Sequence, residues 1–481
     1  MQKVLEAEPV QSGRFARGER SEERQLPDAP PLRKLLGPSV ILVGVGVASG
    51  EYILFPYIAS QAGLVFLWAA IVGVAVQFFI NMEIERYTLA TGETAIGSFQ
   101  RLWRPWGAIL AAGAILATMW PGWATSAATV GTFALGFGDP NLIAIGVLLV
   151  IGAILTVSPV VYNTVEKLQF LKVGAILLFM VIALLAAIKA TAFEDSTAVV
   201  TSFGTFPSEI QLAILVGALA AAGAGGANNL VQSNWIRDKG FGMGKYVPRI
   251  VSPITGQEEA RPDAERLSFP TDEANMARWR VWWKHANLEQ FVSFACVATI
   301  TIVVFSLLAY STVFQNPDLP DSSGFDFIAL EASVLDGAVG DWFGTMFLAV
   351  GAISLFAAAL GIVDYVSRLV SDVIYTGYTR ASGSTWTESR LYFAVVWTMI
   401  VFGSAILLVG FDQPLVLLTI STVMGGAIMT VYTILLLITN RRYLPDAIQL
   451  GGYRRVILAA SVLLLGTCTV IVALNEAKKL F

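Results

Sequence analysis

The sequence predicts an all-α membrane protein that crosses the bilayer many times. Of its 481 residues, 56% are hydrophobic and only 14% are charged, and the mean hydropathy is +0.68. Soluble domains carry roughly a quarter charged residues, so this chain lacks the polar surface of a water-soluble fold. The two cysteines, Cys296 and Cys468, lie in apolar runs, and His285 is the single histidine. These counts exclude a disulfide framework, a cysteine zinc site and a histidine-rich metal centre, and the net charge of -4 gives no basic patch for nucleic acid.

The spans follow from length and hydropathy. A helix that crosses a bilayer needs about 20 predominantly apolar residues. Eleven segments meet this requirement and lie at 36–62, 65–90, 106–136, 141–158, 166–190, 208–236, 281–313, 342–376, 388–409, 413–438 and 453–473. The protein is therefore expected to be embedded in a lipid bilayer.

The segments outside the spans differ in character. Residues 1–35 are mostly polar and contain no apolar stretch of a signal peptide, so we predict a disordered tail on the cytoplasmic side. The loop 237–280 contains four prolines and no apolar periodicity, and a loop of this length is either a functional lid or a flexible insert. We expect an ordered loop packed against the inner vestibule.

Lysine and arginine predict the orientation. The tail and the loops at 91–105, 237–284 and 439–455 fall on one side, and nine basic residues lie between Arg237 and Lys284. The opposite loop, 314–341, has no lysine or arginine and six acids. The positive-inside rule then places the N-terminus in the cytoplasm and the C-terminus outside.

Two spans are predicted to be broken in the middle. The first is apolar to Val47 and is then interrupted by Ala48, Ser49, Gly50 and Glu51. The sixth contains Gly223, Gly225 and Gly226, followed by Asn228 and Asn229. Each glycine costs a helix about 1 kcal/mol relative to alanine, so this stretch should unwind. Freed backbone is tolerated at membrane depth only in a cavity or inside the protein.

The positions of the breaks predict an inverted repeat. Spans 1 and 6 are separated by five spans, so they cross the membrane in opposite directions. We therefore expect spans 1–5 (36–190) and 6–10 (208–438) to be repeats, with 453–473 as an additional span and the substrate site between the two breaks. The alternative is that the small residues only let helices pack closely.

Glu51 is the most informative residue at the breaks. An acid at mid-membrane costs about 2.5–3.5 kcal/mol on insertion scales, so it needs a partner or a function. We interpret it as a cation ligand or proton carrier that faces Asn228 and Asn229. A carboxylate there disfavours an anionic cargo. The alternative interpretation is that Glu51, Asn228 and Asn229 only cap the ends of the broken helices.

Other polar and aromatic residues within the spans are weaker candidates. Three charged residues spaced four apart share one helix face: Asp364, Arg368 and Asp372. They form either part of an ion-coupling route or a salt-bridge ladder. Trp120 and Trp123 flank a Pro-Gly pair in span 3, which indicates either an aromatic wall of the cavity or a packing kink.

The sequence resembles the Nramp family of proton-coupled divalent-metal transporters between residues 36 and 240. The resemblance rests on Gly37-Pro38, the broken first span, and Ala90-Thr91-Gly92 at the end of span 2. It implies the leucine-transporter type of inverted repeat. The family's Asp-Pro-Gly-Asn motif aligns with Ala48-Ser49-Gly50-Glu51, and its Met-Pro-His motif aligns with Gly226-Ala227-Asn228.

The departures from the family pattern bear on the cargo. The Asp and Met ligands of the family are absent, and its Asn position is Glu51. Without a thioether, a metal cargo would be a hard cation held by oxygens, with Glu51 and Asn228 as its ligands.

We therefore expect a transporter rather than an enzyme, because no HExxH or nucleophile-elbow motif is present. The first hypothesis is an alternating-access transporter of a divalent cation. The alternative is a symporter of a small cationic or zwitterionic organic solute. H⁺ or Na⁺ is the expected coupling ion, no cofactor is expected, and the oligomeric state stays open. A third possibility is a sensor or scaffold that has lost transport.

Overall fold

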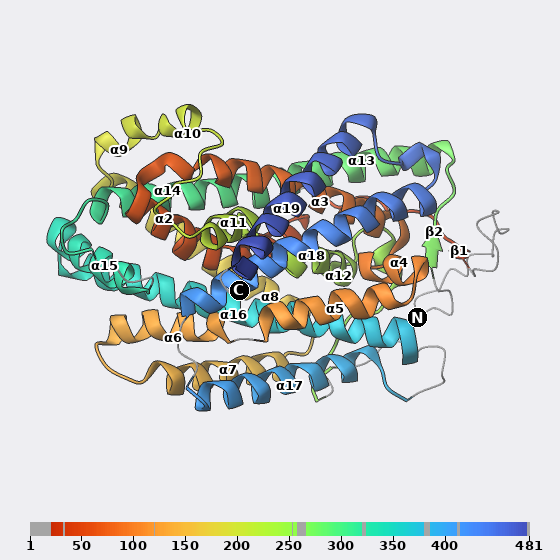
Figure 1. Ribbon diagram of the computed structural model, residues 1–481. Coiled ribbons are helices and arrows are strands. Elements are labelled where there is room, and N and C mark those ends of the chain that lie inside the picture. The colour runs from red at the N-terminus through yellow and green to blue at the C-terminus, as the bar shows by residue number, and fades with distance from the viewer. Residues whose placement is uncertain are drawn as a thin grey trace.

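The computed structural model describes residues 21–31, 34–119, 121–252, 254–256, 266–319, 324–379, 385–410 and 414–478. Eleven helical segments in these ranges are long and apolar enough to cross a membrane, as the sequence predicts. They lie roughly along one direction, with α9, α10 and α15 at one end and β1 and β2 at the other (Figure 1). We call these the α15 end and the strand end.

The first repeat contains spans 1–5. Its helices are α1 (Pro38–Gly46), α2 (Phe55–Ala62), α3 (Trp68–Thr91), α4 (Ala95–Leu102), α5 (Pro105–Thr118), α6 (Gly122–Leu135), α7 (Pro140–Val157) and α8 (Val161–Ala186). A π-helical stretch, Ser49–Leu54, precedes α2, and a 3₁₀ turn, Gly63–Phe66, follows it. The short helices α9 (Ala190–Asp195) and α10 (Ala198–Thr201) lead to the second repeat.

The second repeat contains spans 6–10, and one further span follows. Its helices are α11 (Leu212–Ala221), α12 (Gly226–Lys239), α13 (Glu273–Glu289), α14 (Val297–Thr312), α15 (Asp326–Val339), α16 (Asp341–Ile374), α17 (Glu388–Leu408) and α18 (Pro414–Tyr443), and the last span is α19 (Gly452–Lys478). Two π-helical stretches, Gln290–Cys296 and Tyr375–Thr379, and two 3₁₀ turns, Gly242–Tyr246 and Asp446–Ile448, complete the described elements.

Local signals explain where several helices begin. Asp139 accepts hydrogen bonds from the backbone N–H groups of Asn141 and Leu142, with Pro140 in the first turn of α7. Asp272 caps α13 in the same way, and the hydrogen bonds from Asn275 hold the pKa of this carboxyl below its ordinary value. Such caps satisfy N–H groups that have no partner within the helix.

The prediction of a disordered tail is wrong for residues 21–31. β1 (Ser21–Glu23) pairs in parallel with β2 (Arg266–Ser268). Leu26 is buried, and its backbone N–H donates to the side chain of Asn275. The polar composition of this segment hid its order, because the strand partner comes from the loop 237–280 and the apolar cluster that contains Leu26 comes from that loop, α3, α13 and the end of α18.

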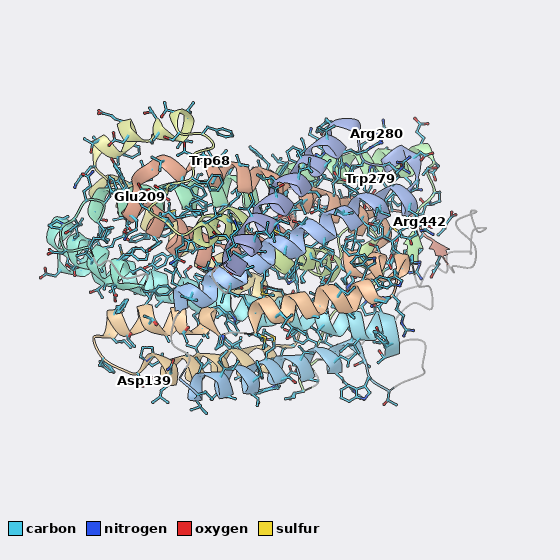
Figure 2. The ribbon with its side chains drawn as sticks, viewed as in Figure 1. Trp68, Asp139, Glu209, Trp279, Arg280 and Arg442 are labelled. Carbon is cyan, nitrogen blue, oxygen red and sulfur yellow. The ribbon has the colours of Figure 1, made fainter. Side chains whose placement is uncertain are left out.

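Charged side chains lie at both ends of the molecule, and Figure 2 labels four of them. Arg280 and Arg442 lie at the strand end, and Asp139 and Glu209 lie at the α15 end. Exposed apolar side chains are numerous along the spans between these ends, for example Leu171, Leu185 and Val401. This surface fits an integral multi-pass membrane protein.

The core is centred on α1. This half-helix packs against α8, α12 and α16, and all nine of its residues are buried. The helices that carry the two predicted breaks therefore lie inside the bundle, where unwound backbone can find partners.

Candidate functional site

The first break lies where the sequence predicts it. α1 ends at Gly46, and the π-helical stretch begins at Ser49. Ala48, between them, has φ −159° and ψ −77°, which is outside the helical region. The chain therefore leaves helical geometry for two residues, Val47 and Ala48, and resumes it at Ser49, two residues before Glu51.

The second break also lies at its predicted position. α11 ends at Ala221 and α12 begins at Gly226. Gly223, Gly225 and Gly226 have φ of 101°, 78° and 60°, in the region that side chains disfavour and glycine adopts freely. The glycine-rich sequence is thus required by the backbone path itself.

The two breaks are in direct backbone contact. A Cβ atom on Gly46 would overlap the carbonyl group of Gly223, and one on Gly50 would lie 2.8 Å from the carbonyl oxygen of Ala221. Glycine at these positions of span 1 permits the close approach. The structure therefore joins the two unwound regions, as the inverted-repeat interpretation requires.

Glu51 connects the breaks and does not line the cavity between them. Its Oε1 accepts a hydrogen bond from the backbone N–H of Gly223 at 3.0 Å, and the side chain is fully buried. Its Oε2 has no hydrogen-bond partner. The carboxylate thus satisfies an amide group that the break leaves without a helical partner.

The amide groups of Asn228 and Asn229 donate their hydrogen bonds to groups other than Glu51. Asn228 donates to the carbonyl oxygen of Leu42 at 3.2 Å. Asn229 donates to Gln77 at 3.2 Å and to Asn81 at 2.6 Å. The reason is competition, because the backbone of the second break and the side chains of α3 provide nearer partners.

Gln77, which the sequence analysis did not single out, holds the second break together. Its Oε1 accepts from the N–H groups of Ala224 and Gly225 at 3.0 and 2.8 Å. Its Nε2 donates to the carbonyls of Ala220 and Ala222 at 3.1 and 2.7 Å. One amide side chain thus replaces the helical hydrogen bonds lost at this break. A single glutamine in an otherwise apolar part of span 2 was the sequence signal that could have identified this residue.

Lys172 is the second residue that the sequence analysis missed. It lies in the middle of α8, only 2% exposed, and its ammonium donates to the carbonyl oxygen of Gly44 in α1. Its charge acts on Glu51. A lysine inside an apolar span is itself a signal, because such residues are rare there and mark functional positions.

A cavity of about 80 Å³ lies at the breaks. Its wall is made mainly of alanine, glycine and larger apolar side chains, and no charged side chain of the described residues lines it. The polar wall comes from α6, α12, α16 and α18 and consists of Ser126, Asn228, Tyr365, Ser421 and Thr422. Oδ1 of Asn228 is buried and has no hydrogen-bond partner.

The cavity receives some of the predicted site residues. Ala48, Gly226, Asn228 and Trp123 line it, and the indole N–H of Trp123 donates to Thr118 across the interruption of span 3. Trp120 lies outside the described residues, as does the side chain of Ser49. Gly50 and Asn229 are not among the residues that line the cavity.

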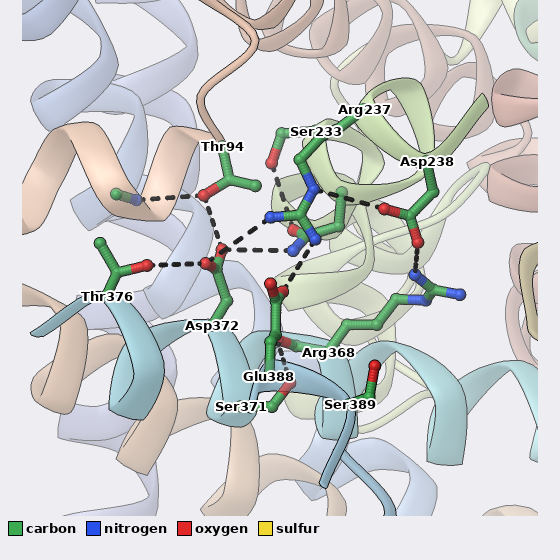
Figure 3. Close-up of polar contacts among 12 residues, drawn as sticks. Thr94, Ser233, Arg237, Asp238, Arg368, Ser371, Asp372, Thr376, Glu388 and Ser389 are labelled. Carbon is green, nitrogen blue, oxygen red and sulfur yellow. Dashed lines mark hydrogen bonds and ion pairs between the residues drawn. The ribbon is translucent and has the colours of Figure 1, made fainter. Parts of the chain in front are cut away.

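Asp364, Arg368 and Asp372 lie in a buried ion-pair network. Figure 3 shows Arg368 and Asp372 with their partners. Arg368 contacts Asp364 at 2.9 Å and Asp238 of α12. Arg237 contacts Glu388 at 2.8 Å, and Asp372 accepts from Thr94 at 2.6 Å. The network therefore fastens α12 to α16, α17 and α4, and none of these residues lines the cavity.

The described residues do not form a conventional metal centre. They contain no group of three or more His, Cys, Asp or Glu side chains placed to hold an ion. Divalent cations such as Ca²⁺ and Mg²⁺ take six or more oxygen ligands, whereas the cavity wall offers the amide oxygen of Asn228, hydroxyl groups and backbone. A metal cargo would have to keep most of its water.

Comparison with solved structures identifies the fold. No protein-family model and no curated protein sequence matches the chain. A mutant of the Eremococcus coleocola manganese transporter superposes with a TM-score of 0.63 at 12% identity, over 94% of this chain and 89% of that chain. The same transporter with an aromatic bis-isothiourea substituted compound gives 0.64 at 12%, over 95% and 90%.

A second kind of transporter shares the architecture. Mhp1, a nucleobase-cation-symport-1 family transporter in a closed conformation with bromovinylhydantoin bound, gives a TM-score of 0.53 at 13% identity, over 92% of this chain and 91% of that chain. The chain thus has the Nramp-like, leucine-transporter type of fold, and the fold prediction is confirmed.

Proposed function

We propose that this protein is a secondary active transporter of a compact organic solute, which it binds in the cavity between the two broken helices. The single observation that carries this proposal is the chemistry of the cavity wall. The wall is mainly apolar, it lacks charged side chains among the described residues, and it holds one buried amide oxygen, Asn228 Oδ1, without a partner.

The wall supports a cargo with an apolar body and at least one N–H donor. An unpaired buried acceptor costs about 1–3 kcal/mol, and a donor on the cargo would remove this cost. Trp123 and Tyr365 offer aromatic surface to the same solute, and such faces also attract amines. Small amines, amides and N–H heterocycles fit this description, and the bound hydantoin of the Mhp1 structure belongs to the last class.

Alternating access is the expected mechanism. In this fold, one bundle of helices rocks against the remainder around a fixed site. α1 and α12 each form half of a broken span, and each has one end at the cavity. A small displacement of these half-helices can therefore open the cavity to one side without unfolding a whole span.

A divalent cation is the second candidate, favoured by the fold similarity to the manganese transporter. It would use Asn228 and Glu51. The position of Glu51 behind the wall and the nearby positive charge of Lys172 support it less well.

Thermal-shift assays followed by proteoliposome uptake would separate these functions. The panel contains small amines, amides, amino acids, N–H heterocycles, Mg²⁺ and Mn²⁺. We expect an organic solute to be taken up, and Asn228→Ala to weaken its binding about tenfold, equivalent to about 1.4 kcal/mol. Asn163→Ala, on the exposed face of α8, is the matched control. Uptake of Mg²⁺ or Mn²⁺ that is abolished by Glu51→Gln would contradict the proposal.

Ala117→Leu tests the location of the site independently. Ala117 is a buried residue of the cavity wall, and three additional carbon atoms would occupy part of a volume of about 80 Å³. Uptake should be lost while the protein remains folded. Unchanged uptake would place the site elsewhere.

A further inference from the structure

Lys172 occupies an unusual position at the first break. α8 approaches the end of α1 so closely that a Cβ atom on Gly44 would lie 2.6 Å from Oε1 of Gln169. One turn further along α8, the ammonium of Lys172 donates to the carbonyl oxygen of Gly44. The charge is therefore buried at the backbone of the broken helix.

The end of α1 is a place where a cation is stabilised. The last carbonyl groups of a helix have no partner within it and carry the negative end of the helix dipole. Ser354 of α16 donates to the carbonyl oxygen of Val47 at 2.9 Å, so a hydroxyl group lies beside the same helix end. In transporters with broken helices, such half-helix ends and unwound carbonyls coordinate the coupling ion.

We infer that the ammonium group of Lys172 takes the place of the coupling cation at the end of α1, so that the protein couples transport to protons and does not use Na⁺ at this position. The inference rests on the proposed transport function and identifies its coupling ion.

The argument for protons follows from covalent attachment. A Na⁺ ion can leave its site, whereas a lysine side chain cannot. The positive charge at Gly44 can therefore change only if an N–H bond of the ammonium breaks, with the electron pair remaining on Nζ and the proton passing to water on one side of the membrane. Reprotonation from the other side would complete the cycle.

The surroundings leave Lys172 one charged partner. Among the described residues, Glu51 is the charged group whose field acts on the ammonium. The charged groups toward this end of the helices packed on α8 have other contacts. In α16, Asp364 and Arg368 pair with each other, and Asp372 contacts Thr94 and Arg237. In α12, Asp238 pairs with Arg368, Arg237 with Glu388, and Lys239 with Glu166 of α8. Lys172 and Glu51 thus carry opposite charges that interact without a direct contact. Loss of one proton from the two groups changes their net charge.

The first experiment needs no transported solute. Thermal unfolding of the purified wild-type protein is measured in NaCl and in N-methylglucamine chloride at equal ionic strength. The wild type and Lys167→Ala, a control on the exposed face of α8, should show no saturable response to Na⁺. Lys172→Ala opens a cation-sized space at Gly44 and should gain a saturable increase of about 2 °C or more in Tm.

Three results of this experiment would overturn the inference. The first is a saturable stabilisation of the wild type by Na⁺, since the cation position would then be open. The second is a folded Lys172→Ala protein that does not respond to Na⁺. Lys172→Met, which fills the space without charge, should also show no response, so a Na⁺ effect in that variant would equally contradict the inference. If Lys172→Ala does not fold, the wild-type and Lys172→Met titrations still decide.

The second experiment uses proteoliposomes and whichever panel solute the wild type takes up. An inward H⁺ gradient should drive accumulation, and an inward Na⁺ gradient should not. Lys172→Met should retain solute exchange and lose at least about tenfold of the H⁺-driven accumulation. Na⁺-driven accumulation by the wild type would refute the inference and leave the proposed function intact. Failure of every solute would refute the proposed function, and the Na⁺ titration of Tm would still test the role of Lys172.

Discussion

The carboxylate of Glu51 accepts a hydrogen bond from the backbone N–H of Gly223 at 3.0 Å, and this contact connects the two unwound regions of the bundle. The residues are 172 positions apart in the chain. The acid that the sequence analysis interprets as a cation ligand or proton carrier therefore anchors one break to the other. Any movement of α2 away from α11 has to break this bond or carry Gly223 with it.

Replacement of Glu51 tests this connection. Glu51→Gln keeps an acceptor for the Gly223 N–H, and Glu51→Ala removes it and leaves a buried donor unpaired. Both variants lose the negative charge, so the difference between them isolates the hydrogen bond. We expect the alanine variant to be less stable than the glutamine variant by about 1–3 kcal/mol, measured by chemical unfolding in detergent. Equal stabilities would show that the bond contributes little.

Gln77 should be more important for stability than its neutral side chain suggests. Gln77→Leu leaves the N–H groups of Ala224 and Gly225 and the carbonyls of Ala220 and Ala222 without this partner. At about 1–3 kcal/mol for each buried group left unpaired, we expect a loss of at least about 2 kcal/mol, seen as a lower Tm. Gln211→Leu, at an exposed position just before α11, is the control and should unfold like the wild type. A normal Tm for Gln77→Leu would mean that water replaces the side chain.

Arg368 carries the buried network at the strand end. Arg368→Met leaves Asp364 buried without its cation and leaves Asp238 with Arg237 alone, at 3.3 Å. Removal of one partner of a buried pair costs about 3–5 kcal/mol. A second substitution, Asp238→Asn, removes one of the two buried negative charges that Arg368 contacted and should restore part of this loss. Arg390→Met, on the exposed face of α17, is the control. A double mutant no more stable than Arg368→Met would contradict the assigned pairing.

Glu331 of α15 predicts a dependence of stability on pH. Burial raises the pKa of this carboxyl from 4.5 to about 8, and its residue is 2% exposed. A raised pKa means that the folded protein binds the proton more tightly than the unfolded chain. This contribution is fully present below pH 4.5 and is lost as the pH rises toward 8.

The slope from this one group is at most about 1.4 kcal/mol per pH unit. Glu331→Gln should flatten the dependence of Tm on pH between 5 and 8. Glu209→Gln, an exposed acid at the same end of the molecule, should leave it unchanged. A Glu331→Gln protein with the wild-type pH profile would show that the carboxyl does not titrate in this window.

Much of the fold could be predicted because its signals are local. Span length follows from runs of apolar residues, and the two breaks follow from the glycines around Gly225 and from Gly50 and Glu51. The prediction of disorder was wrong for residues 21–31 because β1 depends on a strand more than 240 residues away, which no local signal reveals. The partners of Glu51 and Asn229 could not be read from the sequence, because they come from other helices.

The sequence alone determined that this protein crosses a membrane, that its first and sixth spans unwind, and that the two repeats have opposite directions. Hydropathy and backbone freedom are properties of neighbouring residues, so they can be read along the chain. The tertiary structure decided which polar group meets which. It brings Gln77 to the second break and Lys172 to the end of α1, because a buried hydrogen bond depends on the distance between helices, which spacing in the sequence does not fix.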